Sequence, residues 1–191
     1  MAENKKTHKD PSLPEVYKIT GNVSNDGVLI SSKENSENLT SRGYGTLEKD
    51  TLTLNFYEAL FLQSRGLLEV LKGRAGKRLN QQELLQKSNL QEKNAWVKYL
   101  IYRDLRSRGY VVREGFGLGI DFRVYERGEY GKATASYLIL GVQEGKPVSV
   151  NRLVEVMKNA QSLKKKLVLA VVNRRGEIVY YTLSTLTMKR S

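Results

Sequence analysis

The chain has 191 residues, a formal net charge of +12 and no cysteine, and its length allows one good core or two small domains. The lack of cysteine excludes disulfide bonds and thiolate metal sites. The only histidine is His8, in a polar N-terminal segment, so a Ser-His-Asp triad or a histidine metal site is implausible. We expect no metal and no cofactor.

The positive charge is concentrated in the second half of the chain. Residues 1–92 carry 13 lysine and arginine residues and 12 acidic residues, whereas residues 93–191 carry 19 and 8. A basic half beside a neutral half favours a polyanionic partner such as nucleic acid. No apolar run approaches the length of a membrane span or the core of a signal peptide. We therefore expect a soluble, cytoplasmic protein.

The first half predicts a small mixed α/β domain over residues 15–91, after a disordered polar tail at residues 1–14. Asn25-Asp26-Gly27 is a turn signal between two expected strands within residues 16–30. Ser31 or Ser32 is a candidate N-cap for a short helix that Gly43 ends. The other expected elements are a strand at 51–56, a helix at 57–66, a strand at 67–72, a polar connector at 73–80 and a helix at 81–88.

Residues 92–191 predict a second domain in which helices pack on a mixed sheet. In a helix at 92–109, Trp96, Leu100 and Leu105 fall near one face. The glycines of GFGLG (115–119) lack the spacing of a dinucleotide fingerprint and indicate a turn. The other expected elements are strands at 110–115, 120–125 and 136–142, an amphipathic helix at 149–166, a central strand at 167–172, a turn at 173–177 and a final strand at 178–186.

Several segments are similar to the archaeal tRNA-splicing endonuclease family. In the second half they are YRDLRSRGYVVREG (102–115), GLGIDFRVYERG (117–128), ASYLILGV (135–142), NAQSLKKKLVLAVV (159–172) and IVYY (178–181). In the first half, SRGYG is followed by LNFYEALFLQSRGLLEV. The resemblance implies a small N-terminal α/β domain and a nuclease-like C-terminal α/β domain of the restriction-endonuclease type. It also implies a homo- or hetero-oligomer, typically of four units, acting on pre-tRNA with a bulge-helix-bulge at the intron junctions.

The family's chemistry needs no metal and uses three side chains. A tyrosine helps to deprotonate the ribose 2′-hydroxyl, a histidine protonates the leaving 5′-oxygen, and a lysine stabilises charge on phosphorus. The products are a 2′,3′-cyclic phosphate and a 5′-hydroxyl. Each role suits its residue type, since a base, an acid that titrates near neutrality and a fixed cation are required.

The resemblance implies that two of the three triad positions keep the family's residue and that the third does not. The tyrosine corresponds to Tyr125, and the lysine corresponds to Lys165, with Lys164 and Lys166 as neighbours. The histidine position is Thr134, or Ala133 if the loop register differs by one. Neither side chain is a general acid near pH 7.

Other basic residues are candidate RNA contacts. The family's helix arginine, which helps to sandwich a bulge base, aligns with Lys158. A second such arginine has no clear match, and Tyr180 or Tyr181 lies near its position. Arg174 and Arg175 join the candidates, although turn residues of this kind are commonly solvated.

The final strand predicts a contact with another chain. Val179, Tyr180 and Tyr181 belong to an apolar, β-branched strand near the terminus, and such an edge pairs readily. The resemblance implies a tail-to-tail dimer contact in this region. It also implies an acidic loop that enters a partner's basic cleft, for which the candidate here is the loop around Glu144.

Three hypotheses for function follow. In the first, the chain is a structural, non-catalytic subunit of a splicing endonuclease, and a partner chain supplies the complete triad. In the second, it is a catalytic subunit whose histidine is replaced at position 133 or 134. In the third, it is a nuclease-fold nucleic-acid-binding protein outside splicing.

Overall fold

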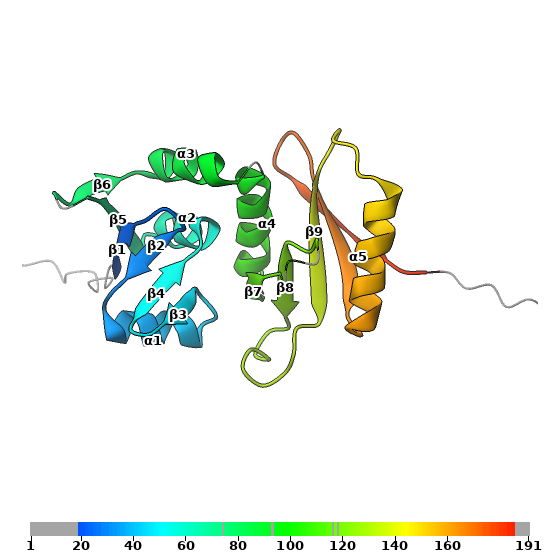
Figure 1. Ribbon diagram of the computed structural model, residues 1–191, viewed down its shortest axis with the longest axis horizontal. Coiled ribbons are helices and arrows are strands. Elements are labelled where there is room, and N and C mark those ends of the chain that lie inside the picture. Colours follow the sequence, from blue (N-terminus) through cyan, green and yellow to red (C-terminus); the bar gives the residue numbers. More distant parts are fainter. Residues whose placement is uncertain (1–18, 74, 93, 116, 118, 186–191) are drawn as a thin grey trace, which may run out of the picture.

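The computed structural model describes residues 19–185 except residues 74, 93, 116 and 118, and it consists of two β-sheets with helix α4 between them (Figure 1). The mixed α/β fold class predicted from the sequence is confirmed. The expected tail, with His8, lies outside the described residues. No helix in the described part of the chain is long and apolar enough to cross a membrane.

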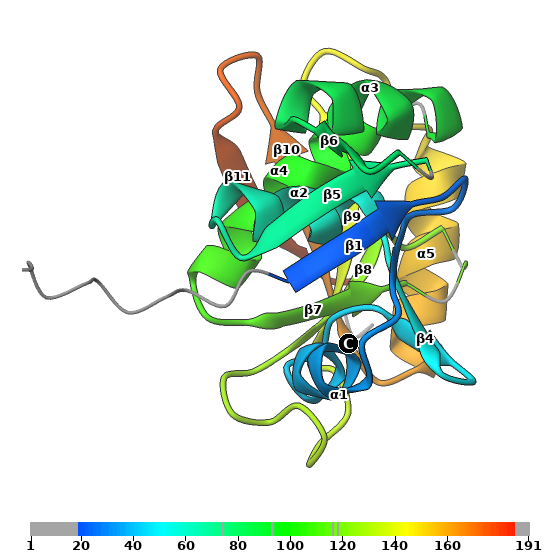
Figure 2. The ribbon, with the colours of Figure 1, turned by 90° about the vertical axis from the view of Figure 1, so that its left-hand side faces the viewer.

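The N-terminal sheet has the strand order β3-β4-β2-β1-β5-β6. Its strands are β1 (Ile19–Val23), β2 (Val28–Ile30), β3 (Thr46–Glu48), β4 (Thr51–Leu54), β5 (Leu68–Lys72) and β6 (Lys77–Leu79). Strands β1 and β5 are parallel, and the other pairs are antiparallel. The helices of this half are α1 (Lys33–Ser41), α2 (Phe56–Ser64) and α3 (Gln81–Gln91). Figure 2 shows β1 beside β5, with α3 above and α1 below them in that view.

Short turn and capping motifs in the sequence explain where elements of the N-terminal half begin and end. The predicted turn between β1 and β2 is confirmed, because the Ser24 amide donates to the Gly27 carbonyl at 2.8 Å. Ser32 caps α1. The polar connector predicted at 73–80 was wrong, since it contains β6, which pairs with β5. Leu79 is the one buried residue of β6, so the alternation that marks a half-buried strand is missing there.

The C-terminal sheet has the strand order β11-β10-β9-β8-β7. Its strands are β7 (Val111–Glu114), β8 (Phe122–Tyr125), β9 (Tyr137–Gln143), β10 (Lys166–Val172) and β11 (Ile178–Leu183). Strands β9 and β10 are parallel and are joined through helix α5 (Val150–Ser162), and the other pairs are antiparallel. Strand β11 is an edge strand, as predicted, and β10 lies inside the sheet.

Helix α4 (Ala95–Ser107) is buried on more than one side, and this overturns part of the predicted face. It packs against α2 of the first half as well as β9 and β10 of the second. Its buried stripe is therefore wide and includes Val97 and Ile101, whereas Trp96 is 46% exposed. Trp96, which was predicted to share a face with Leu100 and Leu105, is thus less buried than these two leucines.

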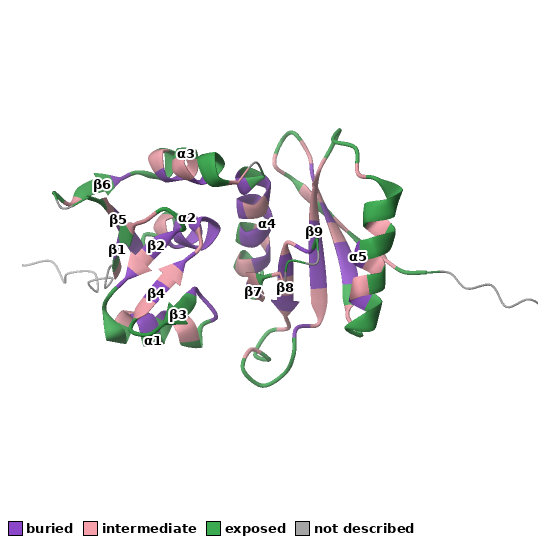
Figure 3. Cartoon of the chain, viewed as in Figure 1, coloured by how far each residue is buried: buried purple, intermediate pink, exposed green. Residues whose placement is uncertain are grey.

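The apolar core lies in two clusters, and the larger one spans both sheets. Figure 3 shows buried residues in both sheets and along α4. It joins buried residues of β2, β4, α2 and β5 to those of α4, β8 and β10. The smaller cluster lies beneath α5, between that helix and the other face of the C-terminal sheet. Strand β8 thus directs Phe122 and Val124 into the larger cluster and Arg123 and Tyr125 away from it.

Candidate functional site

Tyr125, Thr134 and Lys165 line one pocket at an end of the C-terminal sheet, and we call it the tyrosine–lysine pocket. It has a volume of about 260 Å³. Tyr125 is the last residue of β8, Thr134 lies in the β8–β9 loop, and Lys165 directly precedes β10. Its other lining residues are Arg123, Ala133, Ala135, Leu138 and Leu163. The end of β8, the loop that follows it and the distant start of β10 therefore meet here.

The end of α5 determines where Lys165 lies. The helix was predicted to extend to residue 166, but it ends at Ser162. Lys164 then adopts a left-handed backbone (φ 54°), and the Lys165 amide donates to the Ala160 carbonyl at 2.9 Å. A single residue in this conformation reverses the chain after a helix. As a result Lys164 and Lys165 belong to the turn, and Lys165 is carried to the start of β10.

The β8–β9 loop holds Thr134 against Lys165. The Lys165 Nζ donates a hydrogen bond to Thr134 Oγ1 at 2.6 Å. Within the loop, the Ala133 amide donates to the Glu129 carbonyl at 2.9 Å. At its far end, the Ser136 amide donates to the Val124 carbonyl at 2.9 Å. The loop thus brings both candidate histidine positions, 133 and 134, to the wall of the tyrosine–lysine pocket.

Tyr125 is fixed by a second tyrosine that the sequence reasoning did not single out. The Tyr130 ring stands edge-to-face against the Tyr125 ring, with centroids 5.1 Å apart and planes at 89°. Tyr130 also packs over Gly43 of the N-terminal half, since a Cβ added at Gly43 would lie 3.3 Å from that ring. Gly43 has φ +74° and a side chain there would also meet Val111, so this close approach requires glycine.

Lys158, Lys164 and Lys166 are all exposed, and none of the three is among the described residues that line the tyrosine–lysine pocket. Lys164 adjoins Lys165 in the turn, and Lys158 lies on α5. Lys166 lies beside Tyr137, with its Nζ 5.8 Å from the ring centroid. Because neighbouring strand residues point to opposite faces, Lys166 and Leu167 diverge, and Leu167 lies in the cluster beneath α5.

Arg174 and Arg175 lie in the exposed turn between β10 and β11. This turn is at the top of Figure 1, whereas the β8–β9 loop is at the bottom. Strand β10 separates the two ends of the sheet, and its seven residues span about 23 Å. The structure does not bring these two arginines to the tyrosine–lysine pocket.

The candidate contact residues of β11 alternate between its two faces. Val179 and Tyr181 are 51% and 53% exposed. Tyr180 is half-buried against the larger core cluster, and its hydroxyl donates to Asp104 Oδ2 at 2.8 Å. Burial, followed by this hydrogen bond, raises the pKa of Tyr180 well above its usual range. Glu144 is exposed in the turn after β9.

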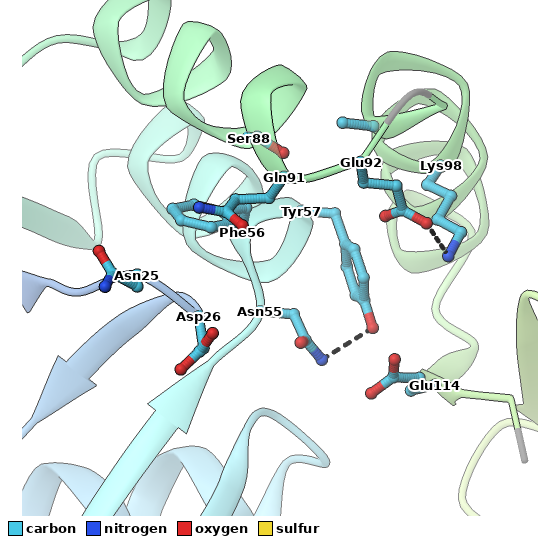
Figure 4. Close-up of a pocket in the computed structure, with 11 residues that line it drawn as sticks. Asn25, Asp26, Asn55, Phe56, Tyr57, Ser88, Gln91, Glu92, Lys98 and Glu114 are labelled. Carbon is cyan, nitrogen blue, oxygen red and sulfur yellow. Dashed lines mark hydrogen bonds and ion pairs between the residues drawn. The ribbon is translucent and has the colours of Figure 1, made fainter. Parts of the chain in front are cut away.

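A second pocket, of about 270 Å³, lies near the other end of β7 and has a different character (Figure 4). Asp26, Glu92 and Glu114 line it, together with Lys98, which pairs with Glu92. The buried Tyr57 hydroxyl accepts a hydrogen bond from Asn55 Nδ2 at 2.9 Å. Burial, followed by the charge of Glu58, raises the pKa of Tyr57. Three carboxylates beside one lysine make this pocket unsuited to a phosphate group.

The fold and the tyrosine–lysine pocket together define a two-sheet α/β protein with a tyrosine and a lysine in one pocket at an end of its second sheet. Residues 95–180 match the family described as tRNA intron endonuclease, catalytic C-terminal domain. Residues 19–85 match the N-terminal domain of the same enzymes. The chain therefore belongs to the tRNA intron endonuclease family.

Curated relatives named tRNA-splicing endonuclease cover most of the chain. The protein from Methanococcus vannielii is 32% identical over 170 residues, which span 89% of this chain and 96% of the relative. The protein from Pyrococcus furiosus is 34% identical over 141 residues, spanning 74% and 80%. A longer relative, from Methanosarcina mazei, is 34% identical over 163 residues, spanning 84% of this chain and 45% of the relative.

Proposed function

We propose that this chain is a structural, non-catalytic subunit of a tRNA-splicing endonuclease that acts on pre-tRNA at bulge-helix-bulge motifs. The observation that carries the proposal is the hydrogen bond from Lys165 Nζ to Thr134 Oγ1. It joins the family's lysine position to a hydroxyl where the family resemblance implies an imidazole. The pocket thus retains two of the three expected functional groups.

The missing group decides the chemistry available to this chain. In the family reaction the 2′-oxygen bonds to phosphorus and loses its proton to a base, while the P–O5′ bond breaks and O5′ gains a proton. Tyr125 and Lys165 fit the base and the cation for this step. The Thr134 hydroxyl does not supply a proton near pH 7, so departure of the 5′-oxygen is left without its acid.

In this proposal the chain contributes its fold and its basic surface, and a partner chain supplies the complete triad. The exposed Val179 and Tyr181 on an edge strand support pairing with another copy or another subunit through β11. The exposed turn at Glu144 is the candidate for a second contact.

The second candidate function is that of a catalytic subunit whose histidine is replaced. It is favoured by the retention of Tyr125 and Lys165 on one pocket wall. The third, a nucleic-acid-binding protein outside splicing, requires equal affinity for bulged and unbulged RNA.

Cleavage of a bulge-helix-bulge pre-tRNA, without added metal, tests the proposal. We expect the purified chain alone to be inactive and activity to appear when a catalytic subunit is added. Thr134→His and Ala133→His are assayed alone in parallel, with Thr134→His/Lys165→Met as the matched inactive control.

Cutting by the unmodified chain alone would contradict the proposal. Cutting by either histidine variant, but not by the control, would favour the second candidate, because the pocket would then lack only its acid.

A further inference from the structure

A pocket lined by three arginines opens where helices α1, α2 and α4 end. It has a volume of about 250 Å³, and Arg42, Arg65 and Arg106 contribute its charge. No carboxylate among the described residues lines it, and the remaining walls are aromatic, aliphatic or glycine, including Tyr44 and Tyr110. We call it the arginine pocket.

Arg106 is held rigidly in this pocket. Its guanidinium carbon lies 3.7 Å from the centroid of the Tyr44 ring, and its Nη2 donates to the Arg42 carbonyl at 3.1 Å. Its Nε is buried and has no hydrogen-bond partner among residues that the structure describes. A guanidinium fixed in this way loses little further freedom when it binds an anion.

Complementing helix dipoles does not account for all of this charge. Arg42 and Arg65 are the C-caps of α1 and α2, and Arg106 lies in the last turn of α4. Each helix end is equivalent to about half a negative charge, so three ends offset roughly half of three guanidiniums. A net positive potential is left in the pocket.

The buried carboxylate of Glu58 does not cancel that potential. Glu58 accepts hydrogen bonds from the Gly45 and Asn55 amides, and its Oε1 lies 3.8 Å from Arg113 Nη1. Burial raises the pKa of Glu58. Arg113 therefore balances this carboxylate directly, although Glu58 also attracts Arg106.

The arginine pocket and the tyrosine–lysine pocket lie at the same end of the C-terminal sheet. Tyr110, on the wall of the arginine pocket, directly precedes β7, and Val111 at the start of β7 pairs with Tyr125. Paired strands are about 5 Å apart, so the two pockets flank one pair of strand ends. Arg127 lies beside the arginine pocket, with its guanidinium carbon 5.7 Å from the Tyr110 ring centroid.

We propose that the arginine pocket binds phosphate groups of the RNA backbone, on nucleotides outside the tyrosine–lysine pocket. The inference rests on the proposed function, which brings RNA to this end of the sheet. Guanidinium forks match phosphate oxygens in pairs, and the Tyr44 and Tyr110 rings form part of the pocket wall.

A carboxylate from a partner is the less suitable occupant. The loop of this chain that is a candidate for entering a partner's cleft has Glu144 as its carboxylate, and Lys146 follows it. Its charges nearly cancel, so a second copy would leave three guanidiniums unmatched. Successive RNA phosphates supply one negative charge each.

The test measures how salt affects binding of the full-length chain to a labelled bulge-helix-bulge RNA by fluorescence anisotropy. Arg42→Gln/Arg65→Gln removes two charges from the pocket and leaves the stacked Arg106 in place. Lys33→Gln/Lys72→Gln removes the same charge from exposed positions of the same half. We expect the pocket variant to reduce the magnitude of the negative slope of log K against log salt by about 1–2, with at least about tenfold weaker binding at low salt. The control variant should change the slope by less than about 0.5.

Equal slopes for the two variants would overturn the proposal. A loss of molar mass in sedimentation, with the slope unchanged, would also overturn it, because the pocket would then hold a partner's carboxylate. A different result would contradict the proposed function, namely that the unmodified chain binds unbulged duplex RNA as tightly as bulged RNA. A smaller slope in the pocket variant would still support the phosphate site in that case.

Discussion

At the residue scale, Tyr180 shows how a side chain expected to contact a partner serves the chain itself. Its hydroxyl reaches Asp104 Oδ2 on α4, and Arg108 Nε donates to the same oxygen at 2.8 Å. The edge strand β11 is thus tied to the helix that joins the two halves. The exposed residues Val179 and Tyr181 keep the opposite face available.

Replacing Tyr180 by phenylalanine should lower the free energy of unfolding by about 1 kcal/mol at pH 7, because one half-buried hydrogen bond is lost. The raised pKa of Tyr180 adds a pH dependence. The folded chain keeps this proton above pH of about 10, where the unfolded chain releases it, so stability falls as pH rises there. Urea titrations between pH 7 and 11 measure both effects.

Tyr180→Phe should show a shallower alkaline loss of stability than the unmodified chain. Part of the loss should persist, because burial also raises the pKa values of Tyr57 and Tyr102. Tyr181→Phe is the matched control, since that ring is exposed on the same strand, and it should change little. If the free energy of unfolding of Tyr180→Phe falls with alkaline pH as steeply as that of the unmodified chain, the pKa of the Tyr180 hydroxyl is not raised by folding.

At the element scale, two helices begin with the same type of cap in opposite surroundings. Glu58 in α2 accepts from the Asn55 amide at 2.9 Å, and Glu83 in α3 accepts from the Asn80 amide at 2.9 Å. Glu58 is 1% exposed and also binds the Gly45 amide. Through Gly45, and through Arg113 Nη1, which donates to the Gly43 and Gly45 carbonyls, it holds the loop beneath Tyr130.

Glu58→Gln should lower the free energy of unfolding by about 1–3 kcal/mol, because the amide NH₂ would face backbone donors in a buried site. Burial raises the pKa of Glu58, so the folded state binds its proton more tightly than the unfolded state. The free energy of unfolding of the unmodified chain should therefore exceed that of Glu58→Gln by most at acid pH. This difference should fall as pH rises above about 4.3.

Glu83→Gln should show the opposite trend. The hydrogen bond from the Asn80 amide, followed by Lys77, lowers the pKa of Glu83. The unmodified chain should be more stable than Glu83→Gln at neutral pH, and this difference should disappear as pH falls below about 4.3. Thermal unfolding of both variants from pH 3.5 to 7 checks the pair. If the stability difference depends on pH in the same direction for both variants, burial does not raise the pKa of Glu58.

The elements differ in how well the sequence predicts them, and the reasons are local. Ser32, Asn25-Asp26-Gly27 and the apolar run of β10 are strong signals, and each matches its element. The end of α5 was misplaced because a left-handed lysine, unlike a glycine, leaves no signature. The contact of Tyr130 with Tyr125 and Gly43 depends on packing between segments distant in sequence, so no local pattern indicates it.

At the scale of the whole molecule, the two sheets share one apolar cluster although the sequence predicts two domains. We propose that residues 15–91 and 92–191 are distinct domains that unfold as one unit. Tyr102 supports this, because it is fully buried and its ring lies 4.9 Å from Tyr57 and 6.1 Å from Phe122. These contacts link α4 to α2 on one side and to β8 on the other.

Leu140→Ala is the sharpest test of that coupling, since Leu140 belongs to the cluster beneath α5, which contains no residue of the N-terminal half. Truncating this buried leucine should cost about 2–5 kcal/mol. If the molecule unfolds as one unit, the slowest-exchanging amides of β2 and β5 lose protection by the same free energy as those of β9 and β10. Hydrogen exchange measures both groups in one experiment.

Tyr102→Ala is the comparison variant, because it removes one of the residues that link the halves and should cost about 3–5 kcal/mol. If Tyr102 alone couples the two halves, the amides of β2 and β5 in Tyr102→Ala should exchange independently of those of β9 and β10. Unchanged protection of β2 and β5 in Leu140→Ala would contradict single-unit unfolding. Coupling matters for the site because Gly43, which belongs to the N-terminal half, contacts Tyr130 against Tyr125. A half that unfolded alone would release that contact and, with it, one wall of the arginine pocket.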